Sequence, residues 1–113
     1  MNTINIVGRV GREPEQRQAG QNTVASLSVA VSHGKDKTSW FNVQIWGKGA
    51  ETVMSYVHKG DLVGFTGQHV EETWTDKSGE QRKKWVLDAS RVHLMPKAAN
   101  ARDEQPDEDD VPF

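Results

Sequence analysis

The chain has 113 residues, a formal net charge of −2 and no cysteine. This length allows one small domain, and the missing cysteines exclude both a disulfide framework and a thiolate metal site. The four histidines lack the i, i+3 or i, i+4 spacing of a zinc site, so we expect neither a metal nor a cofactor. The chain contains no apolar run of roughly 20 residues and no signal sequence, which predicts a soluble protein that is not exported.

The net charge averages two unlike parts of the chain. Residues 1–97 hold 13 Lys and Arg against 10 Asp and Glu, whereas residues 98–113 hold one against six. A mildly basic body favours nucleic acid as its partner, and the acidic tail is expected to screen the body or to meet a basic partner.

The first third of the chain predicts two strands. Residues 3–10 form the first strand, in which Gly8 indicates a bulge or a close backbone approach. Residues 24–32 alternate between apolar and small polar side chains, as in a half-buried strand. Residues 11–23 have no period and predict a loop, and residues 33–38 predict a turn that carries two lysines.

The stretch from residue 40 to 48 alternates strictly, which predicts a strand with two unlike faces. One face carries Phe41, Val43 and Ile45, and the other carries Trp40, Asn42, Gln44 and Trp46. Because the two amides mark the second face as wet, its tryptophans suit stacked nucleobases, and such stacking tolerates any base sequence. The alternative is a strand buried on both sides, with the tryptophans packed under a helix or a partner subunit.

Residues 50–57 have the spacing of an amphipathic helix that plugs the core, and Gly60 is expected at its C′ position. Residues 61–68 return to a strand whose glycines permit the curvature of a small barrel. Residues 69–74 and 82–94 then flank a hairpin turn.

The hairpin loop is predicted to be Lys77–Gly79, with Asp76 opposite Glu80 and Gly79 in the left-handed conformation. This register pairs Trp74 with Arg82 and Glu72 with Lys84, so Trp74 lies beside a basic run. In the same register Trp85 faces away from Trp74, and we assign it to packing or to the barrel surface.

The end of the chain predicts two short segments. Residues 98–108 are acidic and have no period, so we expect a disordered linker. The tip, residues 109–113, consists of Asp109, Asp110, Val111, Pro112 and Phe113. Its terminal aromatic ring can fill a pocket on a partner while the acids meet basic residues around that pocket. The alternative is a solubilising tail with an incidental phenylalanine.

The predicted fold is all-β with one short helix, a five-stranded OB barrel over residues 1–97. The chain resembles the bacterial single-stranded-DNA-binding proteins, most specifically in the runs WFNVQIWGK (residues 40–48), WTDKSG (74–79) and DDVPF (109–113). Weaker similarity lies in residues 6–11, 14–15, 24–30, 57–61 and 67–68. The resemblance implies a homotetramer, base stacking on Trp40, Trp46 and Trp74, and a tip that recruits replication and repair proteins. The family often has an aromatic near His33, which is a candidate replacement.

The expected function is sequence-independent binding and protection of single-stranded DNA in replication, recombination and repair, in the cytoplasm and associated with the nucleoid. The candidate phosphate contacts are the basic residues Arg9, Lys35, Lys37, Lys48, Lys59, Arg82, Lys83 and Lys84. We expect no enzyme, because the sequence lacks an acid, base and nucleophile constellation, a P-loop and a GxSxG motif. There are two alternatives. One is an OB-fold accessory module that binds partner proteins first and nucleic acid only weakly, and the other is an RNA binder.

Overall fold

The computed structural model describes residues 1–96. Lys97, the predicted linker at residues 98–108 and the predicted tip at residues 109–113 lie outside the described residues. Within them the elements follow one another as β1 Ile4–Val10, β2 Glu15–Ala19, β3 Asn22–Gly34, β4 Lys37–Trp46, α1 Lys48–Tyr56, β5 Leu62–Thr75 and β6 Gln81–Leu94. No helix in this part of the chain is long and apolar enough to cross a membrane.

Five strands close into a ring. The strands neighbour one another in the order β1-β5-β6-β4-β3, and β1 pairs back onto β3 through Arg9 with Ala30 and Val10 with Val29. The β4–β6 pair is parallel, whereas the others are antiparallel. β2 lies outside the ring, along β3. A ring of five strands with one short helix confirms the predicted OB-type barrel.

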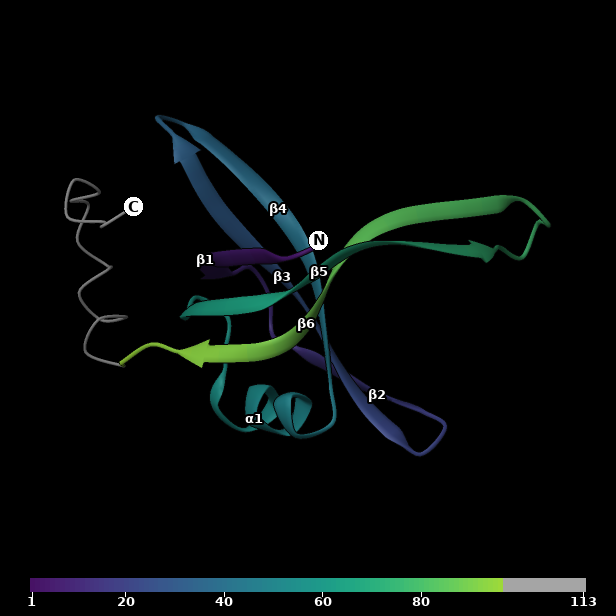
Figure 1. Cartoon of the computed structure of the whole chain (residues 1–113), viewed down its shortest axis with the longest axis horizontal. Helices are drawn as coiled ribbons and strands as arrows, with labels where there is room; N and C mark the ends of the chain where they lie inside the picture. Colours follow the sequence, from purple (N-terminus) through teal and green to yellow (C-terminus); the bar gives the residue numbers. More distant parts are fainter. Residues whose placement is uncertain (97–113) are drawn as a thin grey trace.

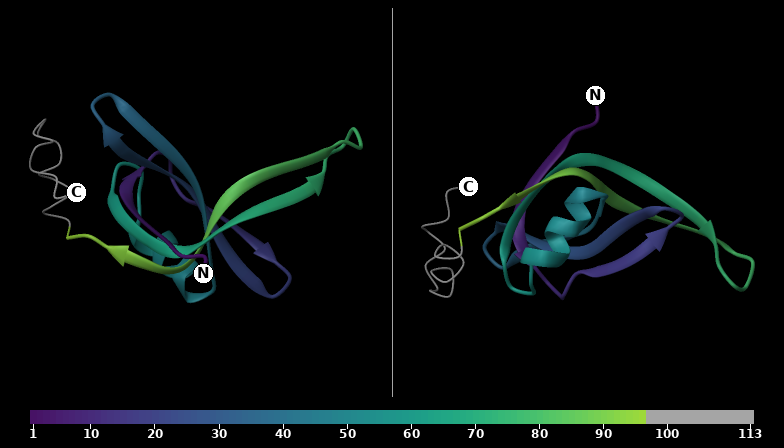
Figure 2. Two further views of the ribbon diagram at one scale, coloured as in Figure 1. Left: turned by 45° about the horizontal axis from the view of Figure 1, so that its top comes forward. Right: turned by 90° about the horizontal axis from the view of Figure 1, so that it is seen from below.

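The core fills the ring with the side chains that point inward at every second position along each strand. On β4, Val43 and Ile45 are buried and Phe41 packs against the core, as the alternation predicts. The helix α1 adds Ala50 and Val53 to the same core and lies against the strands of the ring in the right view of Figure 2. The amphipathic spacing therefore serves to close the barrel.

Three hairpins extend away from the barrel (Figure 1). β2 and β3 form one, β3 and β4 form the second, and the outer halves of β5 and β6 form the third, which reaches furthest to one side. In this third hairpin Trp74 pairs with Arg82 and Glu72 with Lys84, which confirms the predicted register. Gly79 has a φ of 87°, so its left-handed conformation is also confirmed.

The prediction of a loop over residues 11–23 was wrong. Residues 15–19 form β2, which pairs with β3 from Glu15 with Ser26 to Ala19 with Asn22, and β3 begins at Asn22. The segment has no apolar alternation because it pairs outside the ring, where both of its faces meet solvent. Its backbone hydrogen bonds to β3 hold it in the sheet instead.

Two boundaries near the helix also differ from the prediction. α1 ends at Tyr56, and its C-cap is Val57, whose backbone is extended and whose N–H donates to the carbonyl of Val53, so Gly60 is not at the C′ position. Gly60 has a φ of 92° and serves the following turn, where its N–H donates to the carbonyl of Val10. The two strands expected over residues 61–74 are one strand, β5, with an irregularity between Thr66 and Gly67.

The predicted close approach at Gly8 is confirmed. A Cβ at that position would collide with the backbone carbonyl of Ala30 on β3. Gly67 is similarly close to the backbone of Asp88 on β6. These two contacts bring β1 against β3 and β5 against β6 more tightly than any side chain would permit.

Candidate nucleic-acid interface

The side of the sheet that carries Trp40, Gln44 and Trp46, opposite the core, is here called the outer face. Strand pairing extends it across neighbouring strands, because residues in register point to the same side. Trp46 pairs with Val24 on β3, which pairs with Arg17 on β2. Gln44 pairs with Asp88 on β6, which pairs with Gln68 on β5. Further along the β5–β6 hairpin the same side carries Val70, Glu72, Trp74, Arg82, Lys84 and Val86.

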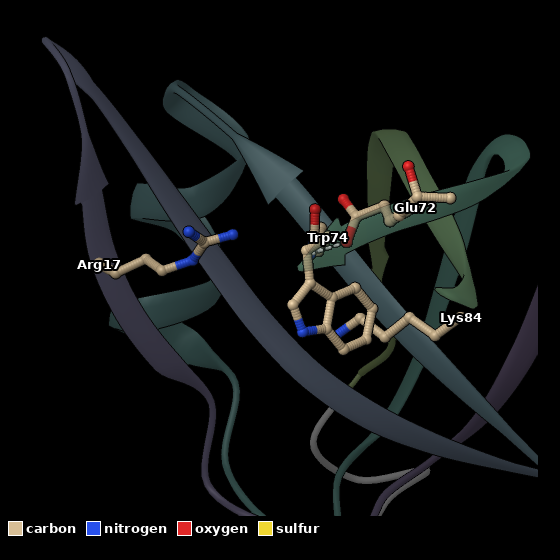
Figure 3. Close-up of a pocket in the computed structure, with 6 residues that line it drawn as sticks. Arg17, Glu72, Trp74 and Lys84 are labelled. Carbon is tan, nitrogen blue, oxygen red and sulfur yellow. Dashed lines mark hydrogen bonds between the residues drawn. The ribbon is translucent and has the colours of Figure 1, made fainter. Parts of the chain in front are cut away.

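A first cleft on the outer face lies between the β2–β3 and β5–β6 hairpins. It has a volume of about 420 Å³ and is lined by Arg17, Gln44, Glu72, Thr73, Trp74 and Lys84. The Lys84 Nζ atom lies 5.8 Å from the centroid of the Trp74 ring, and the ring is 44% exposed. Figure 3 shows Lys84 beside this ring, with Arg17 reaching toward the same space from β2. An open aromatic face between two cations suits a base and its phosphates.

Gln44 departs from the expectation of a wet face. Its side chain is only 6% exposed, and its Nε2 donates to the Oε1 atom of Glu72 at 3.4 Å. Val24 and Val86, also on the outer face, are fully buried. Glu72 at the base of the β5–β6 hairpin contacts Gln44 on β4, so the middle of this face is covered by residues far apart in the sequence. The outer face is therefore dry beneath the first cleft and open around it.

The two tryptophans of β4 are exposed on the single chain, so the alternative in which they pack under the helix is wrong. Trp40 is 62% exposed and Trp46 is 40% exposed. The Trp40 ring lies over Gly11, where a Cβ would collide with it. Arg9 is in register with Trp40 through Ala30, two strands away from it.

Trp46 lines a second cleft on the outer face. This cleft has a volume of about 510 Å³, and its lining is polar or small apart from the indole ring. Its other members are Asn2, Thr3, Thr66, Gly67, Gln68, Asp88, Ala89 and Ser90. Within residues 1–96 no Lys or Arg lines it, in contrast to the first cleft. The two clefts therefore offer an aromatic ring in different electrostatic surroundings.

The predicted basic residues are spread over several elements. Lys84 is brought to Trp74, while Lys35 and Lys37 lie at the β3–β4 turn near the exposed His33, and Lys48 begins α1. Lys83 is on the opposite side of its hairpin, where Nζ lies 4.0 Å from Glu71. Among the described residues, Lys84 is the predicted cation that lies over a tryptophan ring.

Two further predicted cations lie where β1 meets the turn after α1. Arg9 donates from Nη1 to the carbonyl of Gly60 at 2.9 Å. Partial burial lowers the pKa of the Arg9 guanidinium, and the nearby Asp61 partly opposes that change. The backbone N–H of Lys59 donates to Glu13. The Lys59 residue itself is exposed on the surface.

Asp76 organises the tip of the β5–β6 hairpin. Its Oδ1 accepts hydrogen bonds from the Ser78 N–H and hydroxyl and from the Glu80 N–H, and its Oδ2 accepts one from Arg82 Nε at 2.8 Å. These bonds, that from Arg82 foremost, lower the pKa of Asp76 to about 2. Arg82 thus holds the turn while it faces the same side as Trp74.

Trp85 faces away from Trp74, as the register predicts, and it packs on the His69 ring with centroids 4.7 Å apart. It remains 54% exposed, on the far side of the hairpin from the first cleft. The same hairpin therefore presents one tryptophan on each side.

Sequence reasoning missed three residues of the clefts. Arg17 is not predicted from the sequence, because residues 11–23 have no periodic pattern and therefore predict a loop. Asp88 and Gln68 join Trp46 only through the pairing of β6 with β4 and β5. One signal was present for Asp88, since a lone carboxylate between buried Leu87 and Ala89 is unusual in a strand.

Comparison with known proteins finds similarity over most of the chain. The single-strand binding protein family matches residues 1–95. Single-stranded DNA-binding protein 1 of Synechocystis is 37% identical over 102 residues, covering 84% of each chain. The single-stranded DNA-binding protein of Thermosynechococcus vestitus is 34% identical over 110 residues, covering 94% of this chain and 89% of that relative. The protein of that name from Deinococcus radiodurans is 33% identical and is covered over 36% of its length.

Proposed function

We infer that this chain, which belongs to the single-strand binding protein family, binds single-stranded DNA across its outer face. The observation that carries the proposal is the first cleft, in which the exposed Trp74 ring lies between Lys84 and Arg17. Bases stack on the ring and phosphates meet the cations. The family is a binding family and not one of enzymes, in agreement with the sequence.

Trp40 and Trp46 extend the proposed path along β4. Both rings are exposed on the same side as Trp74, and Arg9 is in register with Trp40 across β3. Stacking accepts every base, so the binding is largely independent of sequence and protects the strand along its length. The proposed phosphate contacts along this path are Arg9, Arg17, Lys35, Lys37, Lys48, Lys59, Arg82 and Lys84. Lys83, on the opposite side of the hairpin beside Glu71, is proposed as a peripheral contact only.

The oligomeric state and the cellular role follow the family resemblance. We propose a homotetramer that acts in replication, recombination and repair in the cytoplasm, on the nucleoid. A small domain gains stability from assembly, since its own core is thin. Light scattering in the micromolar range should give four times the 12.6 kDa mass of one chain. A single-chain mass would contradict the tetramer and leave DNA binding untouched.

The acidic end is the proposed site for partner proteins. The proposed tip consists of one large aromatic group preceded by two acids, and its residues are Asp109, Asp110, Val111, Pro112 and Phe113. Phe113 fills a pocket on the partner, Pro112 limits the entropy lost on binding, and the acids meet basic residues at the rim.

Equilibrium titration with a dT oligonucleotide tests the proposed function. Tryptophan emission should be quenched on binding, and a duplex of the same length should bind more weakly, because paired bases offer no free face to the rings. Equal affinity for duplex and single strands would mean that charge alone drives binding. The absence of any binding to dT would contradict the proposal directly.

A further inference from the structure

A row of polar side chains crosses the outer face between Trp46 and Trp74. Gln44 on β4, Asp88 on β6 and Gln68 on β5 are in register with one another across these three neighbouring strands. Gln44 is buried and bonded to Glu72, so it faces the first cleft. Asp88 and Gln68 instead line the second cleft, together with the Trp46 ring. An aromatic ring and a carboxylate therefore face the same space.

The Asp88 carboxylate has unused hydrogen-bonding capacity. Within residues 1–96, neither Asp88 nor Gln68 makes a side-chain hydrogen bond or an ion pair, although Asp88 is half-buried. A half-buried carboxylate is an acceptor that favours N–H donors. Glu72, by contrast, already accepts a bond from Gln44. The second cleft thus presents acceptors that no group of the described chain fills.

The same cleft is unsuited to a phosphate. Among the described residues its lining has a carboxylate and no Lys or Arg, so a phosphate there would meet a like charge. A DNA strand that stacks a base on Trp46 must therefore turn the edge of that base, and not the sugar–phosphate backbone, toward Asp88. The exocyclic amino groups of cytosine, adenine and guanine are N–H donors, whereas thymine has a carbonyl oxygen at the corresponding position. The one N–H donor of thymine, at N3, lies between two carbonyl oxygens that would repel the carboxylate.

We propose that the second cleft is a base-reading subsite, in which Trp46 stacks a nucleobase and Asp88, assisted by Gln68, accepts a hydrogen bond from its exocyclic amino group. This subsite rests on the proposed binding of single-stranded DNA. It adds a preference for amino-bearing bases over thymine at one position of a path that otherwise tolerates any sequence. The preference is modest, because Trp40 and Trp74 stack every base equally.

The test compares the affinities of the full chain for dT and dC oligonucleotides of one length. These two homopolymers contain pyrimidines of similar size, and they differ in whether the base carries an amino group. The measured quantity is the ratio Kd(dT)/Kd(dC), which removes effects common to both strands. Asp88→Asn keeps the shape of the side chain but replaces a charged acceptor by a weaker, neutral one. The ratio should fall about fivefold, the low end of what one base-specific contact provides.

Glu15→Gln is the matched control. Glu15 is exposed on β2, in register with Ser26, and it lines neither cleft. The Glu15→Gln substitution removes the same charge from the same side of the sheet. It should therefore change the affinities for dT and dC together and leave the ratio Kd(dT)/Kd(dC) as in the wild type. A second variant, Trp46→Ala, should weaken binding to both strands and lower the ratio as well, because the base is no longer held against Asp88.

An unchanged ratio in Asp88→Asn would overturn the subsite, as would an equal fall in Glu15→Gln. Either result leaves binding to dT intact, so the subsite can fail without the proposed function. A wild-type chain that binds neither oligonucleotide would instead contradict the function itself.

Discussion

The Nζ atom of Lys84 lies 5.8 Å from the centroid of the Trp74 ring, across the β5–β6 hairpin and facing Arg17. In this arrangement one side chain offers a π-face and its neighbour offers a charge within the length of a nucleotide. Both residues belong to a rigid antiparallel ladder and not to a loop, so their spacing is set by strand register.

Lys84→Gln should reduce the salt dependence of DNA binding. Each phosphate contact on a single strand contributes about −0.7 to the slope of log affinity against log salt. Removing the cation beside Trp74 should therefore make the slope shallower by about 0.7, while tryptophan quenching at saturation persists. Lys83→Gln, on the opposite side of the hairpin and next to Glu71, is the control and should change the slope less. Equal effects of the two variants would contradict the assignment of sides.

Asp76→Asn should lower the melting temperature at neutral pH and have little effect in strong acid. The folded-state pKa of Asp76 is depressed to about 2, foremost by the hydrogen bond from Arg82. A carboxyl with a depressed pKa contributes stability above its unfolded pKa of about 3.9, and this contribution disappears as pH falls through the folded value. The difference in melting temperature between wild type and variant should therefore close between about pH 4 and pH 2. Thermal melts followed by circular dichroism over this range would measure it.

Asp36→Asn serves as the control for that experiment, because Asn tolerates the positive φ of 62° at this position in the β3–β4 turn. Its melting temperature should follow that of the wild type over the whole pH range. A gap for Asp76→Asn that stays constant down to pH 2 would mean that the carboxylate network does not hold the hairpin.

Gly11→Ala should weaken DNA binding without unfolding the barrel. The added Cβ would collide with the Trp40 ring, and an exposed ring can move aside. The expected loss is up to roughly 1–3 kcal/mol of binding, the range for one stacked base. Gly8→Ala is the contrasting variant, since its Cβ would collide with the backbone of Ala30 and should lower stability by roughly 1–3 kcal/mol. Denaturant melts and anisotropy titrations separate the two effects.

The strands and the hairpin register could be predicted because their signals are local. Strict alternation around Val43 identified β4, and Asp76 with Gly79 specified the turn that sets the Trp74–Arg82 pair. The two clefts could not be predicted. They depend on β2, which has no periodic pattern, and on the parallel β4–β6 pair, which joins residues more than 40 positions apart. The burial of Gln44 depends on the same long-range pairing.

Deletion of Phe113 should separate the proposed role of the outer face in DNA binding from that of the tip in partner binding. Affinity for dT should stay within about threefold, or roughly 0.6 kcal/mol, because the rings and cations of the outer face remain. Binding to replication or repair proteins should be lost, because the pocket-filling group is gone. Pull-down of such partners by wild type and deletion variant, alongside the dT titration, measures both. Loss of DNA affinity with partner binding intact would contradict this division.

The central claim is that DNA stacks on one side of the sheet, and it is tested most directly by comparing Trp74→Ala with Trp85→Ala. The two residues lie on opposite sides of the same hairpin and are similarly exposed. Anisotropy of a labelled dT oligonucleotide gives the affinity of each variant. Trp74→Ala should lose roughly 1–3 kcal/mol of binding and Trp85→Ala should bind like the wild type. Equal losses, or a loss confined to Trp85→Ala, would contradict the account.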